Sequence, residues 1–361
     1  MSGARTWRFG VVGTGAMSAT MMECLALERR VDVVAVASAD AARARAFADR
    51  FGIAHAHAHA GLDALLARDD IDAVYIATAT RDHAAHAIAA LEAGKAVLCE
   101  KPFAIGVAQG QRVLEAAQRS GRLFMEAQWT TALPAYRELL RLARQRALGE
   151  PVLLHSEFGI AHDPAAHPRL FEGPGAGVLL DFGVYPIVLA LQALGPVRSV
   201  DAAVRCTAAG VDVHATLQLV HEAGGHSQLA ASLVATLPNR SSLSFAGGHV
   251  GLASPVMGAE SLQVRAVAPA GAVHAGAAKP SLVAALRRQR WVRRLKAALR
   301  GGGSEHPFGA NRYAPQLSHF VALLDAGALE SDLMPHATSL AVLRVVEAAR
   351  QCRPPVVEAS P

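Results

Sequence analysis

The sequence predicts a two-part protein: an α/β part with a parallel, doubly wound sheet, followed by an α+β part with a large, mainly antiparallel open sheet. Up to about residue 126, short apolar runs alternate with helical stretches, which is the βαβ pattern of a parallel sheet. After a break at Gly149-Glu150-Pro151, strand-like runs follow one another with few helices. The length of 361 residues also favours two domains over one hydrophobic core.

Each element of the first part has its own sequence signal. The apolar, β-type runs are FGVVG, DVVAVAS, DAVYIAT, KAVLCE and RLFMEA. Helical spacing predicts helices over residues 16–28, 41–51, 82–93 and 107–119, two of which end at Gly52 and Gly94. We therefore expect a Rossmann domain over residues 1–128.

The second part, expected over residues 129–361, opens with a predicted helix over residues 134–146. The strand-like runs beyond the break are PVLLHSEFGIA, SVDAAVRC, DVHATLQLV, HSQLAASLVAT, RSSLSFAG and SLQVRAVA. A predicted helix over residues 181–193 is the main interruption. Helical periodicity returns over residues 313–326 and 335–350, and these last helices could pack back on the first domain.

The positive charge is concentrated in one segment. The net charge is +5, but residues 287–300 hold seven basic and no acidic residues, so the rest of the chain is mildly acidic. We therefore expect no nucleic-acid partner. Residues 281–300 have the pattern of a basic amphipathic helix, within an insertion over residues 281–303 that ends in a flexible Gly301-Gly302-Gly303 joint. A solvated helix is the simpler interpretation, and an acidic partner or a membrane surface is the alternative.

Four further observations concern location and metals. No apolar run approaches the roughly 18 residues that span a bilayer, and the N-terminus lacks the features of a signal peptide. The four cysteines are scattered, which indicates reduced thiols and a cytoplasmic protein. The run His55-Ala56-His57-Ala58-His59 would place three imidazoles on one face of a strand, but far from the predicted cleft, so we assign no metal site.

A glycine-rich turn follows the first strand. It consists of Gly13, Thr14, Gly15, Ala16 and Met17. This is the context of a dinucleotide fingerprint, in which a tight turn brings helix N–H groups to a pyrophosphate. Ser18 replaces the third glycine, and its side chain is small enough for close helix–strand packing. A plain strand-turn-helix is the alternative.

The end of the second strand normally distinguishes NAD from NADP. Ser38 stands where a carboxylate would accept the ribose 2′-hydroxyl. Asp40 is close enough to accept that bond, or it caps the next helix. Arg43 could reach a 2′-phosphate. We favour NADP and keep NAD open.

A lysine stands at the carboxyl end of a predicted buried strand, in Val97-Leu98-Cys99-Glu100-Lys101-Pro102. Open α/β sheets bind ligands at this edge. Lysine is seldom buried without a reason, so Lys101 is a catalytic candidate. We expect Glu100 either to hold the ribose on the nicotinamide side or to pair with Lys101.

Several blocks of the chain resemble the Gfo/Idh/MocA family, which includes glucose-fructose oxidoreductase, inositol dehydrogenase and dihydrodiol dehydrogenase. The blocks are residues 13–18, Tyr75-Ile76-Ala77-Thr78 with His83 and His86, residues 98–102, 177–185 and 330–335. The resemblance implies a nicotinamide cofactor with Thr78, His83, Glu100 and Lys101 at its site. It also implies a cis bond before Pro102 and an open second sheet that carries substrate contacts and often a subunit interface.

The resemblance further implies that an Asp-x-x-x-Tyr motif, here Asp181 and Tyr185, supplies the other half of the active site. Tyr185 is our candidate acid/base: a phenol has an ordinary pKa of about 10, and the ammonium of Lys101 would lower it. Asp181 would accept a hydrogen bond from a second substrate hydroxyl, or it caps the helix that follows. Trp129, Gln128 and Arg169 are further candidates for substrate contact.

We therefore predict an NAD(P)-dependent oxidoreductase that transfers a hydride between the cofactor and a sugar, cyclic polyol or vicinal diol, or the matching ketone. One alternative is an NAD-dependent glycosidase of the same fold. Another is a non-catalytic nucleotide-binding sensor, although such a protein has no chemical need for Lys101 and Tyr185. An exposed open sheet predicts a homodimer or homotetramer through the second domain.

Overall fold

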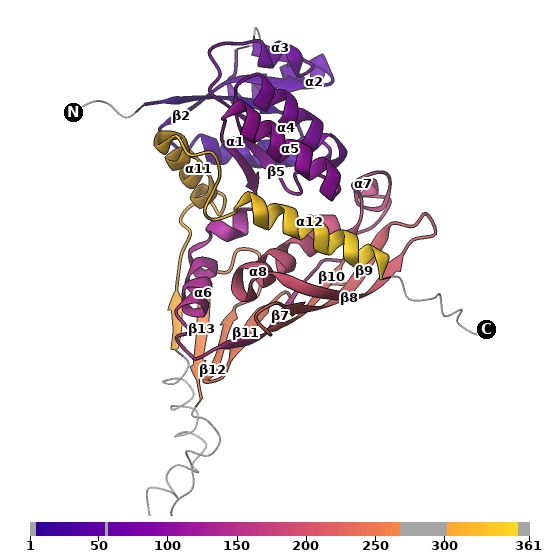
Figure 1. The fold of residues 1–361 in the computed structure, drawn as a ribbon. Coiled ribbons are helices and arrows are strands. Elements are labelled where there is room, and N and C mark those ends of the chain that lie inside the picture. The colour runs from indigo at the N-terminus through magenta and orange to yellow at the C-terminus, as the bar shows by residue number, and fades with distance from the viewer. Residues whose placement is uncertain (1–4, 55–56, 268–301, 353–361) are drawn as a thin grey trace, which may run out of the picture.

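The computed structural model describes residues 5–54, 57–267 and 302–352, and the predicted basic helix at 281–300 lies outside them. Two sheets organise the described chain: a parallel sheet in the first third and a larger, mixed sheet beyond residue 150 (Figure 1). This confirms the predicted fold class. None of the helices in the described ranges has the length and apolar character needed to cross a membrane.

Six parallel strands form the first sheet, in the order β3-β2-β1-β4-β5-β6. They are β1 (Trp7–Val12), β2 (Val31–Ser38), β3 (Ala58–Ala60), β4 (Ala73–Ile76), β5 (Ala96–Glu100) and β6 (Phe124–Ala127). The strand order reverses between β1 and β4, which is where doubly wound sheets bind ligands. Phe9, Tyr75 and Leu98 are fully buried, because helices cover both faces of such a sheet and the strands are apolar throughout.

The described part of the first domain has four helices close to the predicted ranges and one short helix, at residues 63–66, that was not predicted. They are α1 (Ala16–Leu25), α2 (Ala41–Phe51), α3 (Asp63–Leu66), α4 (His83–Glu92) and α5 (Val107–Ser120). Asp40 caps α2 by accepting hydrogen bonds from the N–H groups of Ala42 and Arg43, and the left-handed Gly52 ends it. The helix α1 stops before residue 28, where the N–H of Leu27 bonds to the carbonyl of Cys24 in a tighter turn.

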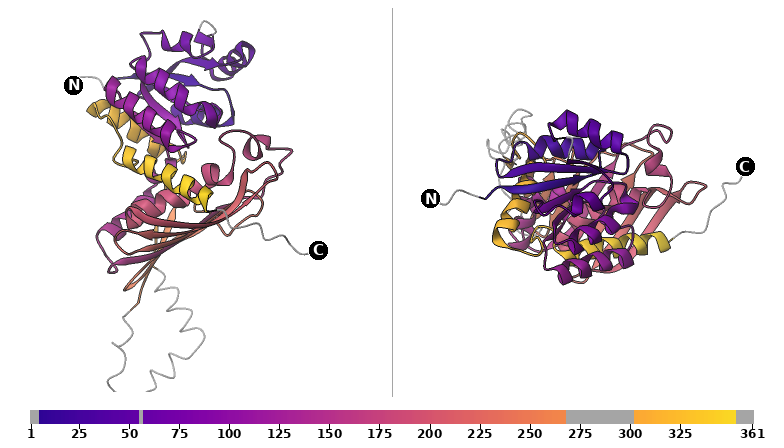
Figure 2. Two further views of the ribbon diagram at one scale, coloured as in Figure 1. Left: turned by 45° about the vertical axis from the view of Figure 1, so that its right-hand side comes forward. Right: turned by 90° about the horizontal axis from the view of Figure 1, so that it is seen from above.

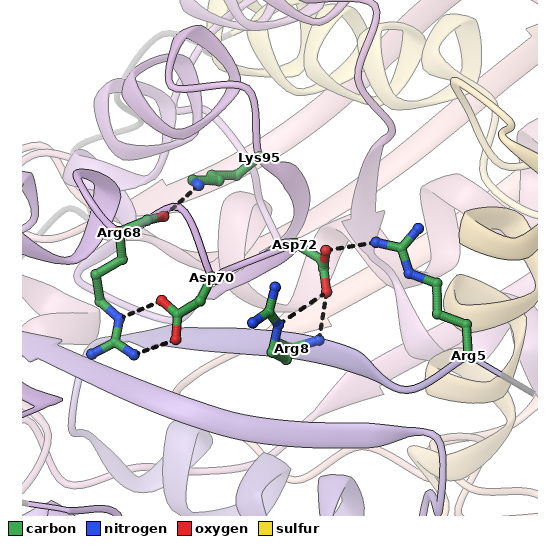
Figure 3. Close-up of polar contacts among 6 residues, drawn as sticks. All are labelled: Arg5, Arg8, Arg68, Asp70, Asp72 and Lys95. Atoms are coloured by element: carbon green, nitrogen blue, oxygen red, sulfur yellow. Dashed lines mark hydrogen bonds and ion pairs between the residues drawn. The ribbon is translucent and has the colours of Figure 1, made fainter.

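Charged side chains tie the amino ends of these strands together, at the edge opposite the predicted cofactor turn (Figure 3). Asp72 accepts hydrogen bonds from Arg5 Nη2 and from the Arg8 backbone N–H, both at 2.8 Å. Lys95, only 7% exposed, donates to the carbonyl of Arg68 at 2.6 Å. Lys95 is therefore a buried lysine with a structural partner, in contrast to Lys101 at the other edge.

Eight strands form the second sheet, in the order β14-β13-β12-β11-β7-β10-β9-β8. They are β7 (Pro151–Gly159), β8 (Val197–Cys206), β9 (Asp212–His221), β10 (His226–Ser232), β11 (Ser241–Phe245), β12 (Gly248–Leu252), β13 (Ser261–Ala266) and β14 (Gly302–Glu305). Within this sheet β7 and β10 pair in parallel, and the other pairs are antiparallel.

Three of the described strands, β3, β12 and β14, have no counterpart among the predicted ones. The prediction of a flexible glycine joint is wrong for Gly302 and Gly303, which belong to β14 and pair with Val264 and Gln263 of β13. Glycine carries no side-chain pattern, so a strand that pairs through its backbone alone leaves no periodic signal. The same reason applies to β12, which contains two glycines in five residues.

Helices cover one face of the second sheet. These are α6 (Pro134–Arg144), which packs on β12 and β13, α8 (Val184–Leu194), which packs on β7 and β10, and α12 (His336–Gln351), which packs on β8. All three lie on the side that faces the first domain, and the opposite face of the sheet is bare in the described part of the chain (Figure 2). The predicted open sheet is therefore present.

The two C-terminal helices join the domains. The helix α11 (Ala314–Ala326) packs against α1 and against the 3-10 turn η3 (Trp129–Ala132), whereas α12 packs against both α5 and α8. Trp7 Nε1 also donates to Asp325 Oδ1 at 2.9 Å, which links β1 to the end of α11. These contacts fix how the edge of the first sheet faces the helices of the second domain.

Candidate active site

The glycine turn after β1 has the shape that a pyrophosphate requires. Gly13 has φ +105°, and a Cβ there would lie 2.4 Å from the carbonyl oxygen of Ala77, so only glycine fits. A Cβ on Gly15, by contrast, would meet no atom within 4 Å. Gly15 caps α1 without a side chain, and no acidic residue stands in the first turn. The N–H groups of this helix end are therefore free to face an anion, so the turn fits the group that the sequence predicts.

The end of β2 lies beside this turn. The Thr14 and Ser38 hydroxyls are 3.4 Å apart, and the backbone N–H of Asp40 donates to the Ser38 hydroxyl at 3.4 Å. The cap on α2 uses Asp40 Oδ1 for both of its bonds, so the capping role left open by the sequence is realised. Arg43 is exposed on the first turn of the same helix.

His83 lies under the loop that follows β5. Its Nδ1 is 2.8 Å from the carbonyl oxygen of Pro102, and its Nε2 is 3.2 Å from that of Thr78. Burial lowers the pKa of His83, so the imidazole is neutral and donates one of these bonds. His83 is 2% exposed; it ties two loops together and presents no free nitrogen to a cofactor. The hydroxyl of Thr78 contacts His86 Nδ1 at 3.0 Å.

Lys101 reaches across to the second domain. The Lys101–Pro102 peptide bond is cis, as the family resemblance implies. The ammonium donates to the backbone carbonyl of Asp181 at 2.7 Å and to its Oδ1 at 2.9 Å. An ammonium carries three N–H donors, so one remains for a further acceptor. The Lys101 side chain is 12% exposed.

Asp181 and Tyr185 come from one helical run. A π-turn η4 (Leu179–Gly183) leads directly into α8, so the helix starts two residues before its predicted beginning. Asp181 therefore stands within the run, where its side chain pairs with Lys101 and makes no cap. The Tyr185 ring centroid lies 4.8 Å from Lys101 Nζ. Both predicted partners of Lys101 are thus brought to it.

The protonation of Tyr185 differs from the prediction. Burial raises the pKa of Tyr185, and the opposing effects of the Lys101 ammonium and of a hydrogen bond from Trp129 do not overcome it. The prediction that Lys101 leaves Tyr185 with a lowered pKa is therefore wrong for the free protein, because the cost of a buried phenolate is larger. Burial is the largest single effect on the pKa of Lys101 and acts to lower it, but Asp181, Tyr185 and Glu100 together outweigh burial and the net direction is upward. At neutral pH the pair is an ammonium and a phenol.

Glu100 is hydrogen-bonded to a residue of the neighbouring strand β4. Its carboxyl accepts a hydrogen bond from the Tyr75 hydroxyl at 2.8 Å, and it is 7% exposed. Burial raises the pKa of Glu100 to about 7. The ion pair of Lys101 is made with Asp181, so the predicted pairing of Glu100 with Lys101 is not formed.

Comparison with known proteins decides the family. The model of an oxidoreductase family with an NAD-binding Rossmann fold matches residues 7–128, and the model of the GFO/IDH/MocA C-terminal domain matches residues 136–251. The bovine trans-1,2-dihydrobenzene-1,2-diol dehydrogenase is 33% identical over 262 residues, which cover 72% of this chain and 77% of that protein. The chain belongs to the GFO/IDH/MocA oxidoreductase family.

Other GFO/IDH/MocA relatives extend the match. The human trans-1,2-dihydrobenzene-1,2-diol dehydrogenase is 32% identical over 69% of this chain and 75% of its own length. The 3-ketoreductase KijD10 from Actinomadura kijaniata, solved with NADP and TDP-benzene, is 25% identical, with a TM-score of 0.77 over 97% of this chain and 98% of that one. An aldose-aldose oxidoreductase from Caulobacter crescentus has the same fold, with a TM-score of 0.78, 21% identity and coverage of 96% and 97%.

These findings confirm the predicted family and its chemistry. The protein is an NAD(P)-binding oxidoreductase, and its relatives are dehydrogenases and reductases rather than the glycosidase or sensor kept as alternatives. The residues at the site fit the nicotinamide dinucleotide at the Gly13 turn, and Lys101 lies at the same edge of the sheet.

In this GFO/IDH/MocA protein an aromatic wall lines the second-domain side of the site. We use this name for Trp129, Phe158, Phe182, Tyr185 and Tyr313. Tyr185 meets Trp129 and Phe158 edge to face, with ring centroids 6.4 and 5.6 Å apart, and Trp129 lies 5.0 Å from Tyr313. The guanidinium of Arg312 stands 5.3 Å from the rings of both Trp129 and Tyr313.

The three residues predicted to contact the substrate lie in different environments. Trp129 belongs to the aromatic wall. Gln128 is 1% exposed, and neither atom of its amide has a hydrogen-bond partner within the described ranges. Arg169 is exposed on the short helix α7 (Pro168–Phe171) and, within the described ranges, forms no hydrogen bond or ion pair with Lys101, Asp181 or Tyr185. Sequence patterns did not single out Phe158, Tyr313 or Arg312, because only the folded chain brings them to Trp129.

Proposed function

We propose that the protein is an NADP(H)-dependent enzyme that interconverts a vicinal diol on a ring with the matching hydroxyketone. The observation that carries the proposal is the meeting of Lys101, Asp181 and Tyr185 beside the aromatic wall. Aromatic side chains favour a substrate with an apolar ring face. Trans-dihydrodiols are the first candidate class, which agrees with the activity named for the relatives that match most of this chain. Pyranose sugars, which also present C–H faces, are the second.

The proposed chemistry follows from the donors that remain free. The bound nicotinamide exchanges a hydride with the substrate carbon. In ketone reduction, the Tyr185 hydroxyl gives its proton to the substrate oxygen, and the third N–H of Lys101 donates a hydrogen bond to the same oxygen. In alcohol oxidation, the Tyr185 phenolate takes the hydroxyl proton. Asp181, partly exposed and paired with Lys101, accepts a hydrogen bond from the neighbouring hydroxyl.

The second strand supports NADP over NAD. Ser38 carries no negative charge that would repel a 2′-phosphate, and Arg43 is exposed one turn into α2. A guanidinium is well suited to bind such a phosphate. Asp40 caps α2 through one carboxylate oxygen. Its second oxygen could accept a hydrogen bond from the ribose 2′-hydroxyl of NAD. The arrangement at Ser38 and Arg43 therefore favours NADP.

We further propose a cytoplasmic homodimer or homotetramer formed through the bare face of the second sheet. This face is hollowed and polar, with His155, Glu157, Gln228, Arg240 and His249 among its lining residues. Polar side chains on both partners would pair in a self-complementary way across a twofold axis. The location agrees with the four free cysteines.

A binding titration followed by a turnover screen tests the function. Protein fluorescence is titrated with NADPH and NADH, and nicotinamide absorbance is then followed with trans-dihydrodiols, pentoses, hexoses and inositols. We expect tighter binding of NADPH and turnover of one class of ring diol. Binding without turnover would support the sensor. Release of a leaving group from an aryl glycoside without net change in absorbance would establish the glycosidase instead.

A further inference from the structure

On each side of the site, a carboxylate lies close to the backbone of a glycine. Gly106 precedes α5, at the end of the loop that begins with Lys101, and a Cβ there would lie 2.8 Å from Glu347 Oε1. Gly177 precedes η4, which carries Asp181, and a Cβ there would lie 1.7 Å from Asp212 Oδ1. Gly177, with φ +113°, therefore requires glycine, whereas a side chain at Gly106 would push the Glu347 carboxylate away from the backbone.

Glu347 caps the Lys101 side of the site. It lies on α12, and its Oε1 accepts a hydrogen bond from the backbone N–H of Val107 at 2.7 Å. Val107 is the first residue of α5, whose own cap residue, Gly106, has no side chain. A carboxylate at a helix N-terminus satisfies an unpaired N–H and interacts favourably with the helix dipole. Glu347 thereby fixes the far end of the loop that starts at Lys101.

Arg350 binds the Asp181 side of the site. Its Nε donates to Asp212 Oδ2 at 3.0 Å, and its Nη2 lies 3.3 Å from both Asp212 Oδ1 and the carbonyl oxygen of Ala176. Asp212 is 3% exposed, and the backbone N–H of Leu179 donates to its carboxylate. Leu179 is the first residue of η4. Arg350 and Asp212 thereby fix the start of the run that carries Asp181 and Tyr185.

Glu347 and Arg350 are three residues apart on α12, so they project from neighbouring positions of one helical face. We propose that this pair forms an interdomain clasp, which sets the position of Lys101 relative to Asp181 and Tyr185. The inference rests on the proposed function, and the two residues act as positioning residues because neither touches the reacting groups. A single rigid turn of α12 holds both loops, so a shift of one loop against the other requires one of these bonds to break.

Steady-state kinetics of the full-length protein tests the clasp. We expect Glu347→Ala and Arg350→Met each to lower kcat about 10- to 100-fold, because a misplacement of about 1 Å can cost about 100-fold. The affinity for NADPH should stay within about threefold, since the Gly13 turn is untouched. Glu347→Gln keeps an acceptor for the Val107 N–H and should keep most of the kcat. Arg344→Met, an exposed change on the same helix, is the matched control.

The double variant gives the decisive readout. If the two bonds form one clasp, breaking either opens it, so Glu347→Ala with Arg350→Met should be no slower than the slower single variant. A loss equal to the product of the single losses, or single variants as fast as wild type, would overturn the clasp. Asp212→Asn with Arg350→Met removes both charges of this ion pair and replaces Arg350→Met if that variant does not fold. A wild-type protein without turnover would overturn the proposed function and, with it, the clasp. An active wild-type protein with single variants of equal activity would overturn the clasp alone, so the two failures can be distinguished.

Discussion

The indole Nε1 of Trp129 donates a hydrogen bond to the hydroxyl oxygen of Tyr185 at 3.2 Å. An indole can only donate, so this bond occupies a lone pair of the tyrosine and leaves the hydroxyl proton free for a substrate oxygen. The bond also becomes charge-assisted once the proton has left, and such bonds are about twice as strong as neutral ones. Trp129 therefore favours the phenolate that forms during reduction.

Replacing Trp129 by phenylalanine should test this relationship, since it removes the donor and keeps a ring. A hydrogen bond to a charged group contributes about 1.5–3 kcal/mol, so kcat/KM should fall roughly tenfold or more. The apparent pKa of the basic limb of the pH–rate profile should rise, because the phenolate loses a donor. An unchanged profile would show that Trp129 acts only as a wall of the pocket.

Tyr185→Phe should abolish most turnover while cofactor binding is retained. Loss of a general acid or base typically costs about 10²- to 10⁴-fold, and the aromatic packing on Phe158 remains. Tyr136→Phe is a suitable control, because the Tyr136 hydroxyl is buried without a hydrogen-bond partner in the described part of the chain. Single-turnover rates with NADPH measure the effect. Equal rates for the two variants would contradict the role of Tyr185.

The two directions of the reaction should respond oppositely to pH. Burial raises the pKa of Tyr185 above its ordinary value, so the phenol predominates at neutral pH and the phenolate only at strongly alkaline pH. Reduction needs the phenol and should be flat through neutrality, then fall at alkaline pH. Oxidation needs the phenolate and should rise over the same alkaline range. Initial rates measured in both directions between pH 6 and 11 check the sign.

Arg43→Ala should weaken NADPH and leave NADH nearly unchanged. An arginine bound to a 2′-phosphate contributes about 1.4 kcal/mol or more, which is a tenfold change in Kd. Arg45→Ala, also exposed on α2, provides the control for a general loss of positive charge. The measurement is the fluorescence titration with both cofactors. Equal weakening of both would assign Arg43 to the helix rather than to the phosphate.

Local signals were sufficient for every strand of the first sheet except β3, and for half of the site. The runs that contain Phe9 and Leu98 are apolar and bounded by turns, and Lys101, Asp181 and Tyr185 stand in short recognisable motifs. The remaining contacts depend on tertiary structure. Trp129 and Tyr185 are 56 residues apart, and Arg350 and Asp212 are 138 apart. No local pattern encodes such pairs, nor the burial that raises the pKa of Tyr185.

Glu126 provides a prediction for stability rather than catalysis. It lies on β6 under the Lys101 loop, where its Oε1 accepts a hydrogen bond from the Phe103 N–H at 3.2 Å and its Oε2 has no partner among the described residues. Burial raises the pKa of Glu126 to about 7 from an ordinary value of 4.5. The nearby hydroxyl of Ser339 offsets this only in part.

The sign of the effect follows from that raised pKa. The folded state favours the protonated carboxyl, so the contribution of Glu126 is fully present below pH 4.5 and is lost as the pH rises through about 7. Above that value the buried charge costs about 3 kcal/mol. Glu126→Gln should therefore match wild type near pH 5 and be more stable by up to that amount at pH 8. Urea unfolding at both pH values measures the difference, with the exposed Glu115→Gln as control. A variant that is less stable at both values would mean that the carboxylate is stabilised in the fold.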